Sequence, residues 1–274
     1  PGIDGDEHIY ILYSGGLGST VAGYFSSADL VHPLVNEFSN AHEMFLFNAD
    51  NTPLGDESTY GVLAHEFQHM IHWNQDSDEA TWMNEGLSEL AALLNGYNPG
   101  GFDWLYINQP DLQLNDWSNA QGTNGPHYGA SFLFTTYFLD RFGETATQTL
   151  IKDPANGFDG VENVLKQINA IDPATGQLIS PDDLFMDWAV TNLTLDASIG
   201  DGRYIYKNYP DATRGAATET IINCPQGPLT RDVHQYGVDY IAIECTGDFT
   251  LSFTGSTVTK LLPVNPYSGA YAFW

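Results

Sequence analysis

Basic residues are scarce in this sequence of 274 residues, which has 8 Lys and Arg against 35 Asp and Glu and a formal net charge of −27. Nucleic acids and anionic membrane surfaces attract proteins through basic residues, so we expect neither as a partner. No apolar run approaches the roughly 18 to 20 residues that cross a bilayer, so no membrane span is expected. The acidity favours a solvated surface and supplies carboxylates that hard cations such as Ca²⁺ prefer.

Cysteine is also rare, with only Cys224 and Cys245 in the chain. An even number permits one disulfide in a protein that is secreted or exposed at the cell surface, and two buried free thiols are the alternative. Both cysteines lie far along the chain from the histidines at 65–72, which disfavours a zinc site with Cys ligands. No signal peptide is visible at the start, and Pro1 and the final YAFW suggest a piece of a longer or processed chain.

The apolar pattern changes along the chain from short runs to helical spacing and back. β-branched and aromatic residues at 8–13 and 44–48 predict two strands. Predicted helices cover 58–73, 81–95, 126–143, 160–170 and 181–193. The stretch 97–126 is rich in Gly, Asn, Asp and Pro, and it predicts a long irregular loop.

The segment HEFQH, residues 65–69, carries the clearest chemical signal. His65 and His69 are four apart on a predicted helix, so both imidazoles project from one face and can reach one tetrahedral cation. Glu66 lies one step round that helix, where it can take a proton from metal-bound water without binding the metal. On the next predicted helix Glu85 can supply a third ligand, and Glu89 one turn later can accept a hydrogen bond from a ligand imidazole.

HEFQH followed by NEGLSE resembles the gluzincin metallopeptidases of the thermolysin-like clan, and HEFQHMIH with NEGLSELA is most similar to bacterial extracellular hyicolysin-like peptidases. The resemblance is strong over 58–95, moderate over 127–195 and faint beyond. It implies that His65, His69 and Glu85 bind one catalytic Zn²⁺ and that Glu66 is the general base.

Two residues of the second motif are expected to support the ligands, namely Glu89 and its neighbour Asn84. The chain departs from the resemblance in two ways, because the interval between the motifs is shorter than in thermolysin and Glu89 stands where the pattern has Asp. His72 shares the face of the two motif histidines. A three-histidine site is an alternative, and packing or an indirect contact is the favoured role of His72.

An oxyanion that develops during acyl transfer needs a donor besides the metal. The resemblance implies a Tyr or His from the following helical part, and the segment His127-Tyr128 opens the predicted helix there. Tyr128 is the favoured candidate and His127 the alternative, while packing alone is the remaining interpretation. If both fail, Tyr97 and Tyr106 in the loop are the next candidates.

Two further kinds of site are expected from the residues. Phe45, Leu46 and Phe47 belong to a strand along which a peptide substrate can lie by backbone pairing at the sheet edge. Calcium is a second candidate ion. The acids considered for it are Asp4, Asp6 and Glu7 near the start, and Asp50, Asp56 and Glu57 before the first helix.

These features predict an α+β fold with a small mixed sheet, an active-site helix above it and a mainly helical lobe. Beyond residue 215 the sequence again resembles strands, in VDYIAIEC and FTLSFTG. We expect a catalytic domain over 1–215, divided into the sheet and ligand helices at 1–98 and the helical lobe at 99–215. An incomplete β-rich module is expected over 216–274.

The sequence therefore predicts a secreted zinc-dependent metalloendopeptidase that hydrolyses peptide bonds in a protein or peptide substrate. The residues WMNEG are similar to the aminopeptidase branch, which keeps an aminopeptidase as an alternative. A zinc-containing binding or adhesion module that has lost activity is the alternative from another class, and an intact Glu66 argues against it. The sequence does not indicate an oligomeric state.

Overall fold

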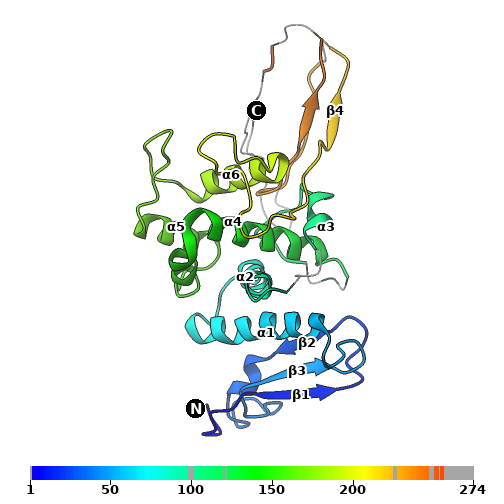
Figure 1. Ribbon diagram of the computed structural model, residues 1–274, viewed down its shortest axis with the longest axis vertical. Coiled ribbons are helices and arrows are strands. Elements are labelled where there is room, and N and C mark those ends of the chain that lie inside the picture. The colour runs from blue at the N-terminus through cyan, green and yellow to red at the C-terminus, as the bar shows by residue number, and fades with distance from the viewer. Residues whose placement is uncertain are drawn as a thin grey trace.

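The computed structural model has an α+β fold, as the sequence predicts. It describes residues 2–97, 102–118, 120, 122–224, 227–246, 250–252 and 254–255. A small sheet lies at one end of the molecule, the helices stack above it, and two short strands extend from the opposite end (Figure 1). The active-site residues predicted from the sequence therefore lie between the sheet and the helical lobe.

The sheet contains β1 (Tyr10–Ser14), β2 (Gly23–Phe25) and β3 (Met44–Asn48), in the order β1-β3-β2. β3 pairs with β1 in parallel and with β2 antiparallel, so the sheet is mixed. All five residues of β3 are buried between these neighbours. The expectation that Phe45, Leu46 and Phe47 form an edge strand is wrong, because both edges of β3 are paired.

The first strand begins two residues later than the sequence predicts. Its predicted start at His8 lies in a local turn, where the Asp4 carboxylate accepts from the Asp6 N–H and the Asp6 carboxylate accepts from the His8 N–H. Such local side-chain bonds compete with strand pairing. A 3₁₀ turn at Ser27–Leu30 follows β2.

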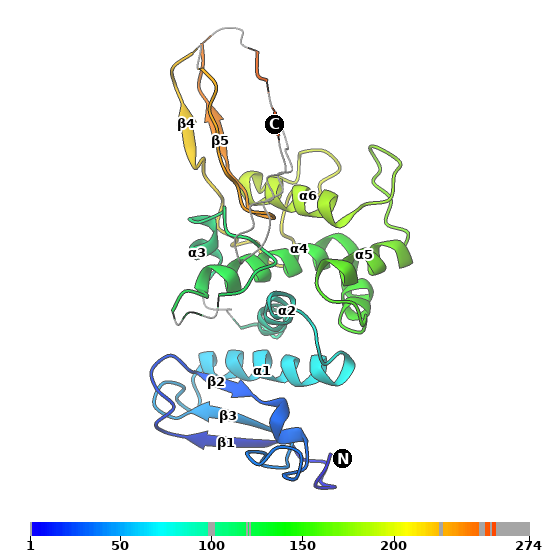
Figure 2. The same cartoon turned by 180° about the vertical axis from the view of Figure 1, so that it is seen from behind.

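Helix α1 (Glu57–Gln75) covers one face of the sheet (Figure 2). The Asp56 carboxylate caps its first turn by accepting from the Ser58 N–H at 3.0 Å. Apolar side chains from the two layers meet between them, and the Phe45 and Phe67 rings lie 6.0 Å apart edge to face. This packing fixes the helix that carries both motif histidines.

Helix α2 (Thr81–Leu94) lies beside α1 and against the lobe. It approaches α4 closely at Gly86, where an added Cβ would lie 2.6 Å from the Ser131 carbonyl oxygen. The Gly86 carbonyl also accepts a hydrogen bond from the Thr135 hydroxyl at 2.9 Å. A glycine in the NEGLSE motif therefore lets α2 pack tightly next to Glu85.

The helical lobe contains α3 (Asp103–Ile107), α4 (Gly125–Leu150), α5 (Phe158–Gln167) and α6 (Pro181–Thr194). Helix α3 lies within the predicted loop, and it begins after Phe102 without a side-chain cap that would mark its start. Helix α4 is interrupted at Gly143, whose φ of 82° is not helical. Gly143 thus ends the first segment of α4, as the sequence predicts, and a second segment continues to Leu150.

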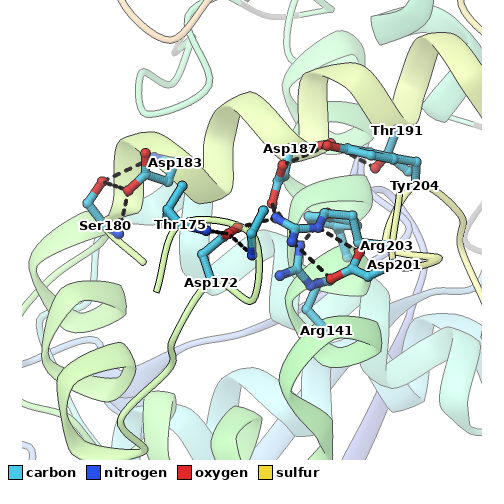
Figure 3. Close-up of polar contacts among 12 residues, drawn as sticks. Arg141, Asp172, Thr175, Ser180, Asp183, Asp187, Thr191, Asp201, Arg203 and Tyr204 are labelled. Carbon is cyan, nitrogen blue, oxygen red and sulfur yellow. Dashed lines mark hydrogen bonds and ion pairs between the residues drawn. The ribbon is translucent and has the colours of Figure 1, made fainter. Parts of the chain in front are cut away.

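A group of charges joins α4 to α6 and the loops beside them (Figure 3). Arg141 and Arg203 both donate to the Asp187 carboxylate, at 2.9 and 2.8 Å. Arg203 also pairs with Asp172 and Asp201. In a chain with 8 basic residues, two of them are used to hold the lobe together.

The strands β4 (Glu219–Ile221) and β5 (Ile241–Ile243) pair in parallel, and Cys224 is bridged to Cys245 beyond them. The segment between the strands returns to the helical lobe, where the Tyr240 hydroxyl donates to the Ala189 carbonyl at 2.7 Å. Within the part of the chain that the structure describes, no helix has both the length and the apolar character needed to cross a bilayer.

Candidate metal centre

Two adjacent helices bring three potential metal ligands together. The Nε2 atoms of His65 and His69, one turn apart on α1, lie 3.0 Å from each other. Glu85 reaches them from the first turns of α2, and its Oε2 lies 3.2 Å from His65 Nε2 and 3.5 Å from His69 Nε2. The sequence predicted this group, and the structure brings all three residues into it.

Each imidazole is oriented through its other ring nitrogen. His65 Nδ1 lies 3.1 Å from Glu89 Oε1, and His69 Nδ1 lies 2.9 Å from Asn84 Oδ1. Because both partners are acceptors, both Nδ1 atoms carry a proton, so in the neutral imidazoles that bind a metal both Nε2 atoms offer a lone pair on the side of Glu85. Glu89 and Asn84 therefore lie where the sequence places the supporting residues.

The three ligand atoms fit a tetrahedral divalent ion. Ligands bound at about 2.0 to 2.2 Å in tetrahedral geometry are separated by about 3.3 to 3.5 Å, close to the separations of 3.0, 3.2 and 3.5 Å in this group. Two lone pairs and a carboxylate oxygen that face one another repel unless a cation lies between them. The side chains are 13 to 18% exposed, so a fourth ligand from solvent or substrate can reach the centre.

The charges of the metal-free group show how strongly these residues interact. Burial disfavours the charged form of His65, but hydrogen bonds with Glu85 and Glu89 outweigh it and raise the pKa of His65 to about 10. Burial likewise raises the pKa of Glu85, while hydrogen bonds with His65 and His69 outweigh it and lower that pKa to about 2. Without a metal ion, His65 is therefore favoured in its protonated form and Glu85 in its ionised form, and the proton lies where the geometry could accommodate a cation.

Glu66 lies on α1 next to His65 and is nearly buried, with 8% of its surface exposed. Its Oε2 accepts a hydrogen bond from the Phe25 N–H of β2 at 2.8 Å. This bond holds one carboxylate oxygen in place and leaves the other for a proton. The negative charge of Glu66 also acts on the neighbouring His65 and Tyr128.

Tyr128 reaches this centre from the first turn of α4. Its ring lies 6.2 Å from the His65 ring, and it packs against Phe102 and Trp117 at 5.4 and 4.9 Å. Burial raises the pKa of Tyr128 far above its usual value, and the nearby carboxylates, Glu85 first, raise it further. The phenol therefore stays protonated and can act as a hydrogen-bond donor.

The close packing of α3 against α4 places Tyr128. At Gly129 an added Cβ would lie 2.0 Å from the Phe102 carbonyl oxygen, so no larger residue fits there. The His127 ring packs 5.7 Å from Trp117, and burial lowers its pKa while Asp116 partly offsets this by raising it. Of the two rings, that of Tyr128 is the one found beside the ligand His65.

The remaining tyrosine candidates lie away from the ligands in the residues described. Tyr106 is completely buried in the helical core and stacks on Trp188 at 5.3 Å. Tyr97 lies over the start of α1, where its ring is 6.3 Å from Tyr60.

The expected calcium groups are not assembled among the residues that the structure describes. Asp4 pairs with His42, and Asp6 pairs with His8. Asp50 accepts from the Gly16 N–H. Nor does His72 join the other two histidines, because the structure groups it with different residues at the end of α1.

Sequence reasoning missed two partners of the centre. Ser88 is fully buried on α2, and its hydroxyl lies 3.0 Å from His69 Nδ1. Its spacing of four from Asn84 places both on one helix face, which is a signal that the sequence contained. The Phe25 N–H that holds Glu66 left no signal, because any residue presents the same backbone group.

Comparison with known proteins gives a distant relative among the metalloproteases. No protein-family model matches the chain. The neutral metalloprotease ShpI of Staphylococcus hyicus is 26% identical to it over 167 residues, which cover 54% of this chain and 37% of the relative. The match therefore spans little more than a third of that protein's length. This similarity and the group His65, His69 and Glu85 together support a relation to the metalloproteases.

Proposed function

We propose that the chain is a zinc-dependent metalloendopeptidase of the gluzincin type, related to the hyicolysin-like peptidases. The observation that carries the proposal is the convergence of His65 Nε2, His69 Nε2 and Glu85 Oε2 within 3.0 to 3.5 Å beside a carboxylate that is not a ligand. Two imidazoles and one carboxylate are the donor set of several catalytic zinc sites. A zinc ion held by these three residues would supply Lewis-acid chemistry, since it would polarise a carbonyl and lower the pKa of water.

Other residues of the chain have separate roles in the proposed peptide hydrolysis. Glu66 takes the proton from the attacking water and returns it to the leaving amine, while the Phe25 N–H keeps its carboxylate in position. Tyr128 donates a hydrogen bond to the oxyanion that develops on the substrate. Glu89 and Asn84 keep the two ligand imidazoles in the tautomer that binds metal.

The free edge of β2 is the proposed place for the substrate backbone, in place of the buried β3. β2 pairs with β3 on one side only, and its Phe25 N–H already contacts Glu66. A peptide that adds to this edge as a further strand would lie next to the general base. Pairing along a strand does not require a free chain end, which favours an endopeptidase over an aminopeptidase.

A location outside the cytoplasm is part of the proposal. The bridge between Cys224 and Cys245 supports it, because disulfides persist mainly in oxidising surroundings. The net charge of −27 is compatible with a protein that stays soluble at the cell surface or beyond it.

The test of this function is the variant Glu66→Gln. It keeps the shape of the side chain but accepts no proton, so casein hydrolysis should fall at least about 100-fold while zinc stays bound. Glu144→Gln removes an exposed carboxylate on α4 and serves as the matched control with unchanged activity. Removal of zinc with a chelator should abolish cleavage, and added zinc should restore it.

Two outcomes would contradict the proposal. Cleavage at near the original rate by zinc-bound Glu66→Gln would exclude Glu66 as the general base. A zinc-loaded chain that cleaves neither casein nor short peptides would indicate a binding module that retains metal without catalysis.

We also propose that the catalytic unit corresponds to 1–215 and that the β-rich module expected over 216–274 is attached to it; residues 256–274 of that expectation lie outside the described residues. Backbone bonds cross this boundary, since the Val238 N–H donates to the Pro110 carbonyl and the Leu114 N–H donates to the Tyr236 carbonyl. A chain that ends after Asp211 should therefore unfold at a lower temperature than the full chain while it keeps its zinc. A truncated chain without zinc or without a cooperative transition would show that the two parts are one unit.

A further inference from the structure

A second group of ligand atoms lies at the end of α1, at its C-cap and in the loop that leads to α2. His72 belongs to the last turn of the helix, Asp76 is its C-terminal cap, and Glu79 lies in the loop that follows. One ligand atom from each of these residues lies within 4.8 Å of those from the other two. We call His72, Asp76 and Glu79 the C-terminal cluster.

Each member of the C-terminal cluster has a buried atom without a partner among the described residues. These atoms are His72 Nε2, Asp76 Oδ2 and Glu79 Oε2. His72 is completely buried, and Asp76 is 9% exposed. Buried polar atoms in proteins are nearly always hydrogen-bonded, so three such atoms in one place require an explanation.

Hydrogen bonds from the backbone hold the carboxylates in place. Glu79 Oε1 accepts from the Ala80 N–H at 2.6 Å and from the Gly157 N–H at 2.7 Å. Asp76 Oδ1 accepts from the Asp78 N–H at 3.4 Å. Each carboxylate is thus fixed through one oxygen while the other is unpaired, as in ligands oriented for a metal ion.

The imidazole can be oriented in the same way. His72 Nδ1 lies 3.4 Å from Gln68 Nε2, and Gln68 Oε1 accepts from the buried Ser88 hydroxyl, so a proton on His72 Nδ1 requires the other orientation of this amide. The two orientations of an amide have the same shape, so Gln68 can present its oxygen to a proton on His72 Nδ1. The lone pair of His72 Nε2 is then available to a cation.

The surroundings of the C-terminal cluster are acidic. Burial raises the pKa of Asp76, and the negative charges of Asp78 and Asp153 raise it further. Burial raises the pKa of Glu79 to about 7, with a further contribution from Asp76. A bound cation would reverse both effects, because it stabilises the ionised carboxylates.

We propose that the C-terminal cluster binds a second divalent cation that is separate from the catalytic ion. One imidazole nitrogen with two carboxylate oxygens suits first-row transition ions such as Zn²⁺ or Mn²⁺, with water as the remaining ligands. The ion would join the end of α1 to the loop that begins α2. This site would therefore stabilise the connection between the two helices.

The first experiment counts cations on the full chain. The protein is saturated with ZnCl₂ or MnCl₂ in separate samples, dialysed into metal-free buffer and analysed by mass spectrometry for metal per chain. We expect two cations on the unmodified chain and one on the double variant Asp76→Asn/Glu79→Gln. The exposed pair Glu144→Gln/Asp159→Asn removes the same charge elsewhere and should retain two.

A second measurement separates this site from the catalytic one. The variant Glu85→Ala lacks a ligand of the first group, so its remaining cation should be the one in the C-terminal cluster. Added Zn²⁺ or Mn²⁺ should then raise its unfolding temperature, and Glu85→Ala/Asp76→Asn/Glu79→Gln should lose this rise. The result stands even if the chain has no peptidase activity.

Several outcomes would overturn the proposal. The proposal is wrong if the unmodified chain never retains more than one cation with either metal, whatever the variants show. Equal metal content in Asp76→Asn/Glu79→Gln and the unmodified chain would overturn it as well. If the double variant does not fold by circular dichroism, His72→Gln replaces it and is judged by the same loss of one cation.

Discussion

The two ligand groups on α1 use similar atoms but differ in their surroundings. His65, His69 and Glu85 come from two helices and are 13 to 18% exposed, whereas the C-terminal cluster includes the fully buried His72. Catalytic metal sites keep a position open for water and substrate, so we call His65, His69 and Glu85 the open group. The C-terminal cluster is more deeply buried, and we call it the closed group. The comparison shows how one helix can support an open group and a closed group about one turn apart.

The largest effect is expected from breaking the open group. Glu85→Ala removes a ligand and leaves the lone pairs of His65 and His69 without their carboxylate, so its zinc affinity should fall by more than about 100-fold. This loss of affinity exceeds the 10- to 100-fold loss that is usual when a residue hydrogen-bonded to a metal ligand is removed. Casein hydrolysis should disappear with the zinc. The measurement is competition with a chromophoric zinc chelator, together with kcat/KM.

The control for this variant is the closed group. Glu79→Gln should leave the zinc affinity of the open group and the rate of cleavage largely intact, since Glu79 contacts none of its three ligands in the residues described. Full zinc content and activity in Glu85→Ala would remove Glu85 from the ligand set.

Tyr128 lies beside the open group, and the closed group has no corresponding tyrosine in the contacts described above. Tyr128→Phe removes a donor that matters only when negative charge develops, so kcat should fall about 100-fold while KM stays nearly constant. The ring stays in place because Phe102 and Trp117 pack against it. Steady-state kinetics on a fluorogenic peptide would measure both constants.

The neighbouring residue gives the matched control. His127→Gln should change kcat little, because the His127 ring packs against Trp117 and does not contact the ligands described above. The reverse pattern, with a large loss for His127→Gln and none for Tyr128→Phe, would assign the donor to His127.

The open group could be predicted from the sequence because local rules determine it. Four-residue spacing puts His65 and His69 on one helix face whatever the rest of the fold does. The second motif required only that α2 pack beside α1, and Gly86 in that motif makes the close contact with α4 possible. Helix positions could be predicted for the same reason, since local side-chain caps by Asp56 and Ser180 mark the starts of α1 and α6.

The closed group and the sheet order depend on contacts that local patterns do not encode. Glu79 is fixed by the N–H of Gly157, which is 78 residues away in the sequence. The position of β3 in the sheet depends on β1 and β2, and its apolar run Met44–Phe47 is equally typical of central strands. A run of four apolar residues therefore could not distinguish an edge from a centre.

Ser88 connects the two groups and gives the smallest expected effect. Its hydroxyl lies 3.0 Å from His69 Nδ1 and 2.5 Å from the side-chain amide of Gln68, which also reaches His72 Nδ1 at 3.4 Å. The chain His69–Ser88–Gln68–His72 thus runs from an open-group ligand to a closed-group ligand. Removal of the Ser88 hydroxyl should therefore affect the hydrogen bonds of both His69 and His72.

Ser88→Ala should weaken zinc binding at the open group by about 10-fold, the lower end of the range for partners outside the ligands. The loss stays small because Asn84 still accepts from His69 Nδ1 at 2.9 Å. Ser131→Ala is the matched control, since Ser131 is equally buried on α4 but its hydroxyl has no partner among the described residues. Chelator competition should show a shift for Ser88→Ala and none for Ser131→Ala. Equal affinities in the two variants would mean that Asn84 alone orients His69 and that the two groups are independent.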